Sequence, residues 1–420
     1  MKVLVGSVVV IAVFIFKVTY SETRYSKTLY DPWNEYSLAK RSDQLDIWHD
    51  QVERNSRFFG IGIVRFENSI CAASDGLNGT CYTRRQCTNI NGVASGRCAS
   101  NIGVCCVVFA TCGDTALYNN TYFVSPNYPN TFDTATSCTL TIRKCNAGIC
   151  QIRIDLLSFS LAQPDGNGYC IFDAMYVLGG ASTVPVICGE NSGQHLYVDF
   201  NGDNDIQIVI STTSALSQAR NWFLRIAQIE CNNPSRAPSG CLMYYTALTG
   251  TVRSFNYGST VSSAILNFNG TNFPGTRELA NLNYGVCIQM VPGYCAIQWS
   301  QSAGDPYSFS VSGDTVGLSV DPGLPTGALI NGACLDDFVV IPNPFYPNGT
   351  AVGSDRFCGN QFNTVTTGSK PFVLTVVTNS TQINMTTDIT MQNVGNRGFS
   401  LMYNQLSCGT TLVNNPLIVG

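Results

Sequence analysis

The chain is 420 residues long, and only 12% of these residues are charged, with a net charge of −4. Globular proteins usually carry about 25% charged residues, so this composition offers no basic surface for nucleic acid or an anionic membrane. The length suggests roughly two to three domains. The 19 cysteines favour disulfides in an oxidising compartment over metal ligation.

The first 21 residues have the layout of a secretory signal peptide. One lysine precedes an apolar run from Val3 to Phe16, and small and polar residues follow up to Ser21, where we expect cleavage. The run is shorter than the roughly 20 residues that a membrane-spanning helix needs. No later segment is apolar enough to span a bilayer, and the tail 409–420 lacks the hydrophobic stretch of a lipid-anchor signal. The sequence therefore predicts a secreted, extracellular protein.

Residues 22–66 form a comparatively charged lead without cysteines. This composition favours a partly helical or flexible segment. The dibasic pair Lys40-Arg41 is a candidate processing site within it.

Six sequons agree with secretion. Each reads Asn-x-Ser/Thr with no proline between, which is the acceptor pattern for N-glycosylation in secreted proteins. The predicted glycosylation sites are Asn78, Asn119, Asn269, Asn348, Asn379 and Asn384.

Six cysteines lie between Cys71 and Cys106, and they could bind a metal, perform redox chemistry or cross-link a knot. No histidine lies nearby, no C-x-x-C pair occurs, and neighbouring cysteines rarely reach one tetrahedral metal together. A segment this short cannot bury enough apolar surface to fold without cross-links. The sequence therefore favours a disulfide knot.

From Cys112 onward, apolar and polar residues alternate in short runs, which is typical of β-strands. A first series lies at 138–144, 151–160, 196–200, 205–211 and 223–230, and a second lies at 251–257, 296–300, 307–313, 336–342, 371–378 and 399–407. The Pro/Ser-rich linker 232–240 separates the two series. The segment from Cys170 to Cys188 also resembles that from Cys334 to Cys358, so one fold is predicted to occur twice.

Several motifs recur in the two repeats. They are the opening Cys112 and Cys241, "VSPNYP" at 124–129 with the weaker "RSFNY" at 253–257, the C-x-[aromatic]-D pattern ending in Asp173, and Cys188-Gly189 with Cys358-Gly359. On these motifs both repeats resemble CUB domains, which are extracellular β-sandwiches. In the second repeat Leu335 replaces the aromatic residue. The six opening cysteines resemble a clip domain, the knot found ahead of many arthropod serine proteases.

The resemblance implies an all-β fold, with two CUB-type β-sandwiches in tandem behind a small N-terminal disulfide-knotted module. The expected parts are a signal peptide (1–21), a charged lead (22–66), a clip-like knot (67–108), a first CUB-like domain (112–231), a linker (232–240), a second CUB-like domain (241–408) and a tail (409–420).

The resemblance also implies disulfide pairs. In the knot these are Cys71 with Cys105, Cys81 with Cys98, and Cys87 with Cys106. The CUB pattern gives Cys112 with Cys138, Cys170 with Cys188, Cys241 with Cys287, and Cys334 with Cys358. Aligning the repeats then pairs Cys150 with Cys231 and Cys295 with Cys408, and leaves Cys145 as an odd cysteine that could link two chains into a dimer. A local bridge from Cys145 to Cys150 is the alternative, and the sequence leaves both open.

Catalytic machinery is not evident in the sequence. A Ser-His-Asp triad needs a histidine, and the chain has only His49 in the lead and His195 at the start of an expected strand. There is no G-x-S-x-G or GDSGG motif. His195 is more typical of a turn or surface residue than of a base, so we predict no enzyme activity.

Calcium is the cofactor to consider, because many CUB domains hold Ca²⁺ through three acidic side chains. The resemblance keeps Asp173 and Asp337, but Ala162 and Gln163 stand where a glutamate is expected. Ca²⁺ needs about six oxygen ligands, and one aspartate per domain is too few.

A second acidic run alternates as in the start of an EF-hand, with Asp199, Asn201, Asp203 and Asp205. It lacks the required glycine and the bidentate glutamate. Strand, Asn-Gly turn, strand is the preferred interpretation. We therefore expect no metal and no cofactor.

The sequence thus predicts a secreted, non-catalytic interaction protein that binds an extracellular protein, of unknown identity, through its CUB domains. One alternative is a regulator or cofactor of an extracellular serine-protease cascade, with a protease as partner. Another is a glycan-binding protein.

Overall fold

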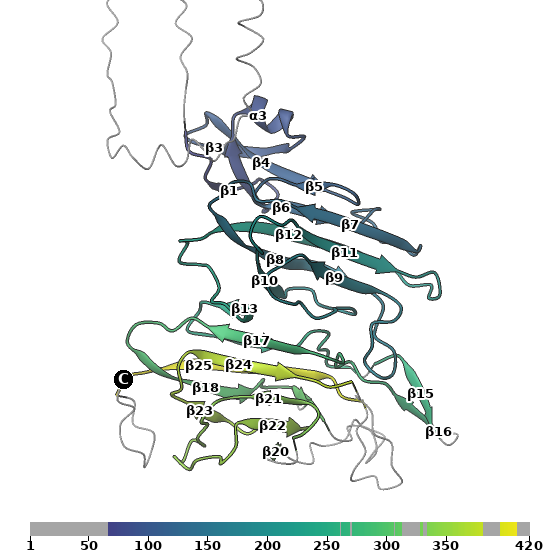
Figure 1. The fold of residues 1–420 in the computed structure, drawn as a ribbon, viewed down its shortest axis with the longest axis vertical. Helices are drawn as coiled ribbons and strands as arrows, with labels where there is room; N and C mark the ends of the chain where they lie inside the picture. The colour runs from purple at the N-terminus through teal and green to yellow at the C-terminus, as the bar shows by residue number, and fades with distance from the viewer. Residues whose placement is uncertain are drawn as a thin grey trace, which may run out of the picture. The chain divides into compact units, whose positions relative to one another are not determined.

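The computed structural model describes residues 66–260, 262–268, 271–305, 307–312, 328–330, 334–380 and 395–409 (Figure 1). The expected signal peptide, nearly all of the lead with Lys40-Arg41 and His49, the tail beyond Gly409, and the sequons at Asn269 and Asn384 lie outside the described residues. The chain from Ile70 onward forms one compact unit.

The knot consists of four short strands and one helical segment. These are β1 (Ile70–Ala72), β2 (Asn78–Tyr82), α3 (Arg84–Asn89), β3 (Val93–Cys98) and β4 (Gly103–Ala110). Thr83 caps the helix, because its hydroxyl accepts from the Gln86 N–H while the Gln86 side chain accepts from the Thr83 N–H. Three disulfides cross-link the knot, and its small apolar clusters are built around the cysteines.

The first sandwich packs two sheets face to face. Its strands are β5 (Thr115–Ala116), β6 (Thr121–Val124), β7 (Thr136–Ile142), β8 (Ile149–Ser160), β9 (Ala174–Leu178), β10 (His195–Asp199), β11 (Ile206–Thr212) and β12 (Asn221–Glu230). One sheet has the order β5-β7-β11-β9 and the other β6-β12-β8-β10. Burial alternates along β11 and β12, as expected for strands with one face in the core.

The knot is continuous with one of these sheets. Strand β4 pairs in parallel with β6 through Val108–Thr121, Phe109–Tyr122 and Ala110–Phe123. The resulting eight-stranded sheet runs β1-β2-β4-β6-β12-β8-β10, with β3 paired to β4 (Figure 1). This continuity was not predicted from the sequence.

The second sandwich repeats the topology of the first. Its strands are β13 (Cys241–Tyr245), β14 (Thr249–Arg253), β17 (Asn283–Ile288), β18 (Tyr294–Gln301), β19 (Phe309–Ser310), β20 (Ala328–Ile330), β21 (Phe338–Val340), β22 (Arg356–Gly359), β23 (Val365–Thr367), β24 (Phe372–Val377) and β25 (Gly398–Ser407), with a separate hairpin of β15 (Ile265–Phe268) and β16 (Thr271–Pro274). The sheets have the orders β13-β17-β24-β21-β22-β20 and β14-β25-β18-β23. In each sandwich the opening strand pairs in parallel with its neighbour, β5 with β7 and β13 with β17. The prediction of an all-β fold with tandem sandwiches is confirmed.

Nine disulfides are present in the described residues. They join Cys71 to Cys105, Cys81 to Cys98, Cys87 to Cys106, Cys112 to Cys138, Cys150 to Cys231, Cys170 to Cys188, Cys241 to Cys287, Cys295 to Cys408, and Cys334 to Cys358. Cys145 is half-buried against the core of the first sandwich, and its N–H donates to Gln228 Oε1 at 2.8 Å. No helix among the described residues is long and apolar enough to cross a membrane.

Candidate functional site

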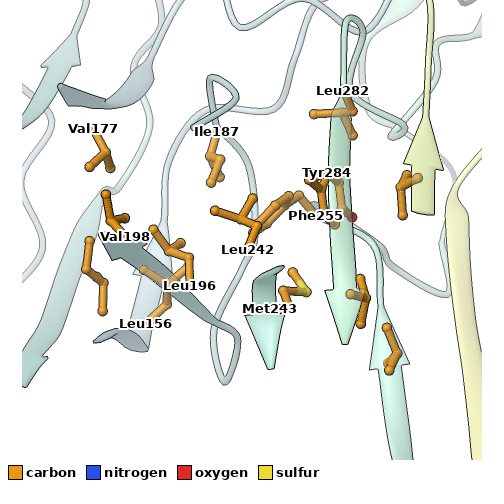
Figure 2. Packing of buried hydrophobic residues seen from close by; sticks show 14 of the residues in the cluster. Leu156, Val177, Ile187, Leu196, Val198, Leu242, Met243, Phe255, Leu282 and Tyr284 are labelled. Carbon is orange, nitrogen blue, oxygen red and sulfur yellow. The ribbon is translucent and has the colours of Figure 1, made fainter. Parts of the chain in front are cut away.

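The two sandwiches meet at a buried apolar seam. Strand β13 of the second sandwich lies beside β10 of the first, and its Leu242 and Met243 belong to the same buried cluster as Leu196 of β10. Figure 2 shows Leu242 between the first-domain side chains and Phe255 of the second domain. Linked domains usually move relative to one another unless their interface is large and apolar. This seam is built on buried apolar side chains of both domains, so it fixes the two sandwiches together.

His195 lies in this seam and not at the surface, contrary to the prediction. Its Nε2 lies 2.9 Å from the Tyr244 carbonyl oxygen and 3.2 Å from the Tyr244 N, so the ring bonds the β13 backbone in either neutral tautomer. The ring also packs edge-on against Tyr245 at 4.8 Å between centroids. Burial, and then Arg153, lower the pKa of His195 from 6.5 to about 4. The histidine is therefore neutral at pH 7 and joins the two domains.

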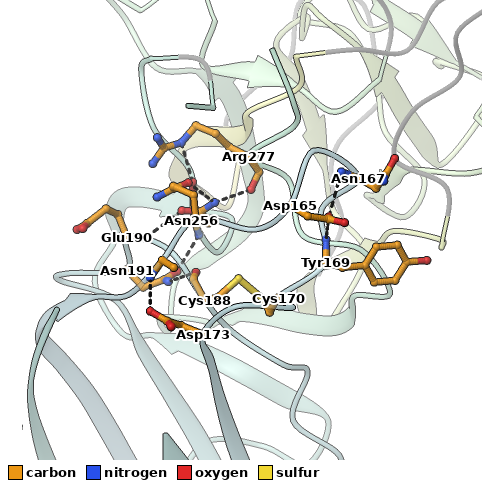
Figure 3. Close-up of a disulfide and its surroundings, with 12 residues drawn as sticks. Asp165, Asn167, Tyr169, Cys170, Asp173, Cys188, Glu190, Asn191, Asn256 and Arg277 are labelled. Atoms are coloured by element: carbon orange, nitrogen blue, oxygen red, sulfur yellow. Dashed lines mark hydrogen bonds between the residues drawn. A yellow bond between two sulfur atoms is a disulfide. The ribbon is translucent and has the colours of Figure 1, made fainter. Parts of the chain in front are cut away.

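Asn256 is the polar centre of the seam (Figure 3). It is fully buried and has φ of 58°, a left-handed conformation that asparagine tolerates better than most residues. Its Oδ1 accepts from the Glu190 N–H at 2.9 Å, and its own N–H donates to Asn191 Oδ1 at 2.7 Å. Its Nδ2 donates to Gln163 Oε1 at 3.0 Å and to the Arg277 carbonyl at 2.8 Å. The second domain thus satisfies buried polar groups of the first.

The loop 165–169 of the first domain adds further contacts to the seam near Asn256. Asp165 Oδ1 accepts from the N–H groups of Asn167 and Tyr169, which fixes the loop, as Figure 3 shows. The loop carbonyl of Gly166 then accepts from Thr276 N at 3.2 Å. A Cβ at Gly275 would lie 2.6 Å from the Gly166 Cα, so the two backbones can approach this closely only because residue 275 has no side chain.

The linker is bound to the first domain. Ala237 N donates to Gln151 Oε1 at 2.9 Å, and Gln151 Nε2 donates back to the Ala237 carbonyl at 3.1 Å. Arg236 and Asp199 form an ion pair at 3.1 Å. The segment between the two sandwiches is therefore held on the first domain, next to the start of β13.

Asp173, the retained acidic residue of the first repeat, is committed to a buried ion pair. Arg220 donates to both carboxylate oxygens, Nε to Oδ2 at 2.6 Å and Nη2 to Oδ1 at 3.1 Å. The Ala162 and Thr213 N–H groups donate to the same two oxygens. An ionised carboxylate has about four acceptor positions, so protein donors occupy those of Asp173.

Asp337, the equivalent residue of the second repeat, has different surroundings. Its Oδ1 accepts from the Asn379 N–H at 2.9 Å, while the Asn379 side chain donates to Asp336 Oδ1 at 2.8 Å. Burial, and then the charge of Asp337, raise the pKa of the buried Glu278 carboxyl well above its usual range. Within the described ranges no three His, Cys, Asp or Glu side chains gather as ligands for a metal ion.

The EF-hand-like run is divided among ion pairs. Asp203 contacts Lys144, and Asp205 contacts Arg143 at 2.9 Å. The strands on either side of this turn, β10 and β11, belong to different sheets. The run therefore connects the layers of the sandwich.

The described sequons differ in exposure. Asn348 is exposed, whereas Asn78, Asn119 and Asn379 are half-buried. Asn119 Oδ1 accepts from the Gln228 N–H at 2.8 Å, and Asn379 Nδ2 already donates to Asp336. Among the four described sequons, Asn348 is thus the one whose side chain is exposed to solvent.

Comparison with known families agrees with this geometry. A sequence profile of the animal CUB domain matches residues 238–406, and a profile of the CUB domain matches residues 112–225. The chain contains two CUB domains. CUB domains are often protein-interaction modules, and in this chain the first CUB domain is joined to the knot by a shared sheet. No curated protein matches the chain.

Several solved structures are similar to the chain. The CUB1-EGF-CUB2 domains of rat MASP-1 share 13% identity over 71% of this chain and 99% of that one, with a TM-score of 0.24. The MASP-1 CUB2 domain bound to Ca²⁺ shares 20% identity over 28% of this chain and 98% of that one, with a TM-score of 0.24. The full extracellular region of zebrafish Gpr126/Adgrg6 shares 12% identity over 74% of this chain and 40% of that one, with a TM-score of 0.25.

Proposed function

We propose that this protein is a secreted, non-catalytic interaction protein whose CUB domains bind another extracellular protein as one unit. The buried seam carries the proposal. It joins the two domain cores through Leu242 and Met243 and closes with hydrogen bonds at His195 and Asn256. Nine disulfides support an oxidising, extracellular setting.

A fixed tandem suits protein binding for an energetic reason. Binding costs free energy because conformational entropy is lost, and relative motion between linked domains is part of that entropy. Because the seam has already fixed the two domains, less entropy is lost when a partner contacts both domains or the knot. The seam therefore favours one composite binding surface over two independent modules.

The test is affinity capture with the mature protein. The secreted chain is immobilised, a partner is captured from extracellular fluid and purified, and its binding is measured by surface plasmon resonance. We expect saturable binding that weakens at least about tenfold when the seam is disturbed by Gly189→Ala, and little change for Gly193→Ala. Failure of any purified extracellular protein to bind, or turnover of the captured protein, would refute the proposal.

A further inference from the structure

Four aromatic rings form a continuous cluster on the outer face of the shared sheet. We call it the aromatic face, and it consists of Phe109 on β4, Tyr122 on β6, Phe223 on β12, and Tyr128 on the turn after β6. Tyr122 and Tyr128 both stack on Phe223 at 5.2 Å between centroids, and Phe109 lies 5.8 Å from Tyr122 and 6.4 Å from Tyr128. Each of these rings is also within reach of a second one, so the cluster is held together by its own packing.

The knot completes the aromatic face with its fourth ring. Phe109 belongs to the knot strand, and the parallel pairing of β4 with β6 places it opposite Tyr122. The Tyr122 hydroxyl is fixed by Asn78 of β2, accepting from its N–H at 2.8 Å and donating to its carbonyl at 2.9 Å. Knot and first CUB domain therefore contribute jointly to one surface.

Charged residues continue this surface on the next strands. Asp155 of β8 lies between two arginines, with Arg153 Nε at 2.7 Å from Oδ1 and Arg225 Nη2 at 2.7 Å from Oδ2. Arg153 also donates to the Tyr197 hydroxyl at 3.1 Å. Two guanidinium groups share one carboxylate here, so this group of three side chains carries one net positive charge. The Asp75 carboxylate of the knot also acts on Tyr122.

The surface is partly open to solvent. Phe109 is 36% exposed, Tyr128 43%, and Leu157, at the β8 bulge opposite Phe223, 44%. The Arg153 side chain is 34% exposed. Exposed apolar groups gathered in one place indicate an interaction site, and aromatic and arginine side chains dominate the energetics of protein interfaces.

We propose that this outer face binds an extended segment of a partner protein that carries a carboxylate beside an aromatic or aliphatic side chain. The apolar side chain packs on Phe109 and Tyr128, and the carboxylate pairs with Arg153. The inference rests on the proposed function, since it names the surface and the chemistry of the protein that is bound.

Charge and spacing select this occupant. The partly exposed Arg153 guanidinium favours a carboxylate at its end of the surface, because it has N–H groups beyond those that donate to Asp155 and Tyr197. Adjacent strands lie about 4.8 Å apart, so the distance from β4 to β8 is about 14 Å, which about four extended residues span. One short segment can therefore contact both the aromatic face and Arg153.

The experiment uses a phage-displayed library of random dodecapeptides, selected on the immobilised full-length protein. We expect enriched peptides with an aspartate or glutamate within about four residues of an aromatic or aliphatic residue. Binding of a synthetic enriched peptide should weaken at least about tenfold for Phe109→Ala, Tyr128→Ala and Arg153→Glu.

Two matched variants serve as controls. Tyr176 is also an exposed aromatic residue but lies on β9 in the opposite sheet, and Arg143 is also an arginine paired with an aspartate but contacts Asp205 at the layer connection. Tyr176→Ala and Arg143→Glu should leave peptide affinity unchanged. Thermal unfolding of every variant confirms that lost binding does not reflect lost folding.

Four outcomes would overturn the inference. The enriched peptides lack acidic residues, or they bind the Arg153→Glu and Phe109→Ala variants as well as the wild type. Sedimentation shows a dimer that Phe109→Ala dissociates, which makes a second copy the occupant. A synthetic peptide of residues 22–66 competes for the face, which makes the chain's own lead the occupant. If the captured partner still binds while these variants have no effect, this inference fails and the proposed function stands.

Discussion

Arg220 and Arg397 occupy the same position in the two repeats, at equal distance before the closing cysteine, but they have different partners. Arg220 binds Asp173 inside the first CUB domain, and both side chains are 0% exposed. Arg397 lies over the Tyr307 ring at 4.1 Å and donates to the Ser259 carbonyl. The repeats thus keep the strand framework and differ in the buried charges beside it.

The first prediction concerns the buried pair. Arg220→Met should lower the free energy of unfolding by about 3–5 kcal/mol, because it leaves the Asp173 carboxylate buried without its cation. Urea denaturation measures the change. Arg143→Met, which breaks the exposed pair with Asp205, should lower the free energy of unfolding far less, because solvent screens an exposed ion pair. Equal losses in the two variants would contradict the assignment.

The second prediction concerns calcium. EDTA should leave the melting temperature unchanged, because protein donors occupy the Asp173 oxygens and Asn379 donates to both Asp336 and Asp337. Differential scanning calorimetry with EDTA and with millimolar Ca²⁺ measures this. A ligand that binds only the folded state raises its stability, so a calcium-dependent rise of several degrees would reveal a site.

The third prediction concerns Glu278. Burial raises its pKa in the folded protein, so its contribution to stability is present below about pH 4.5 and is lost as the pH rises through the raised pKa. Glu278→Gln removes this ionisation. The variant should exceed the wild type in free energy of unfolding at pH 8, and match it near pH 4. Urea titrations at both pH values measure the two free energies of unfolding. A variant that is more stable than the wild type only at low pH would contradict the prediction.

The fourth prediction concerns His195, whose pKa shift has the opposite sign. Its folded-state pKa is lowered to about 4, so the stability it contributes is present above pH 6.5 and is lost as the pH falls towards 4. The full loss is about 3 kcal/mol. His195→Gln should flatten the pH dependence of unfolding between pH 6.5 and 4. An unchanged slope in the variant would show that His195 is not the group that titrates.

The fifth prediction concerns Gly189, the glycine of the first Cys-Gly motif. It has φ of +75°, and a Cβ there would collide with Asn256 Oδ1. Gly189→Ala should therefore destabilise the seam by more than the roughly 1 kcal/mol that a left-handed alanine costs alone. Gly193 has φ of +82° with open space around its Cβ position, so Gly193→Ala isolates the backbone cost. Limited proteolysis within 232–240 should be faster in Gly189→Ala only.

The strands could be predicted from the sequence, because apolar and polar residues alternate along a strand that has one face buried. Strands β11 and β12 alternate in burial as their sequences alternate in polarity. The similarity of the Cys170–Cys188 and Cys334–Cys358 segments likewise predicted a repeated sandwich.

The seam could not be predicted in this way, because its contacts join residues that are distant in the chain. Asn256 bonds Gln163, Glu190 and Asn191, and no local pattern marks an asparagine as the partner of another domain. His195 was assigned to a turn or the surface because a single polar residue at a strand start carries no sign of a neighbour. Arg220 had one usable signal, its recurrence as Arg397, but that recurrence did not identify Asp173 as its partner.

The parallel pairing of β4 with β6 has a consequence for assembly. A strand at the edge of a sheet exposes unpaired N–H and C=O groups, which can template association with other chains. Strand β6 has β12 on one side and β4 on the other, so the knot occupies the edge that the first CUB domain would otherwise expose. The three knot disulfides hold that cover in place. The knot thereby protects the first CUB domain from strand-to-strand aggregation while it contributes Phe109 to the outer face.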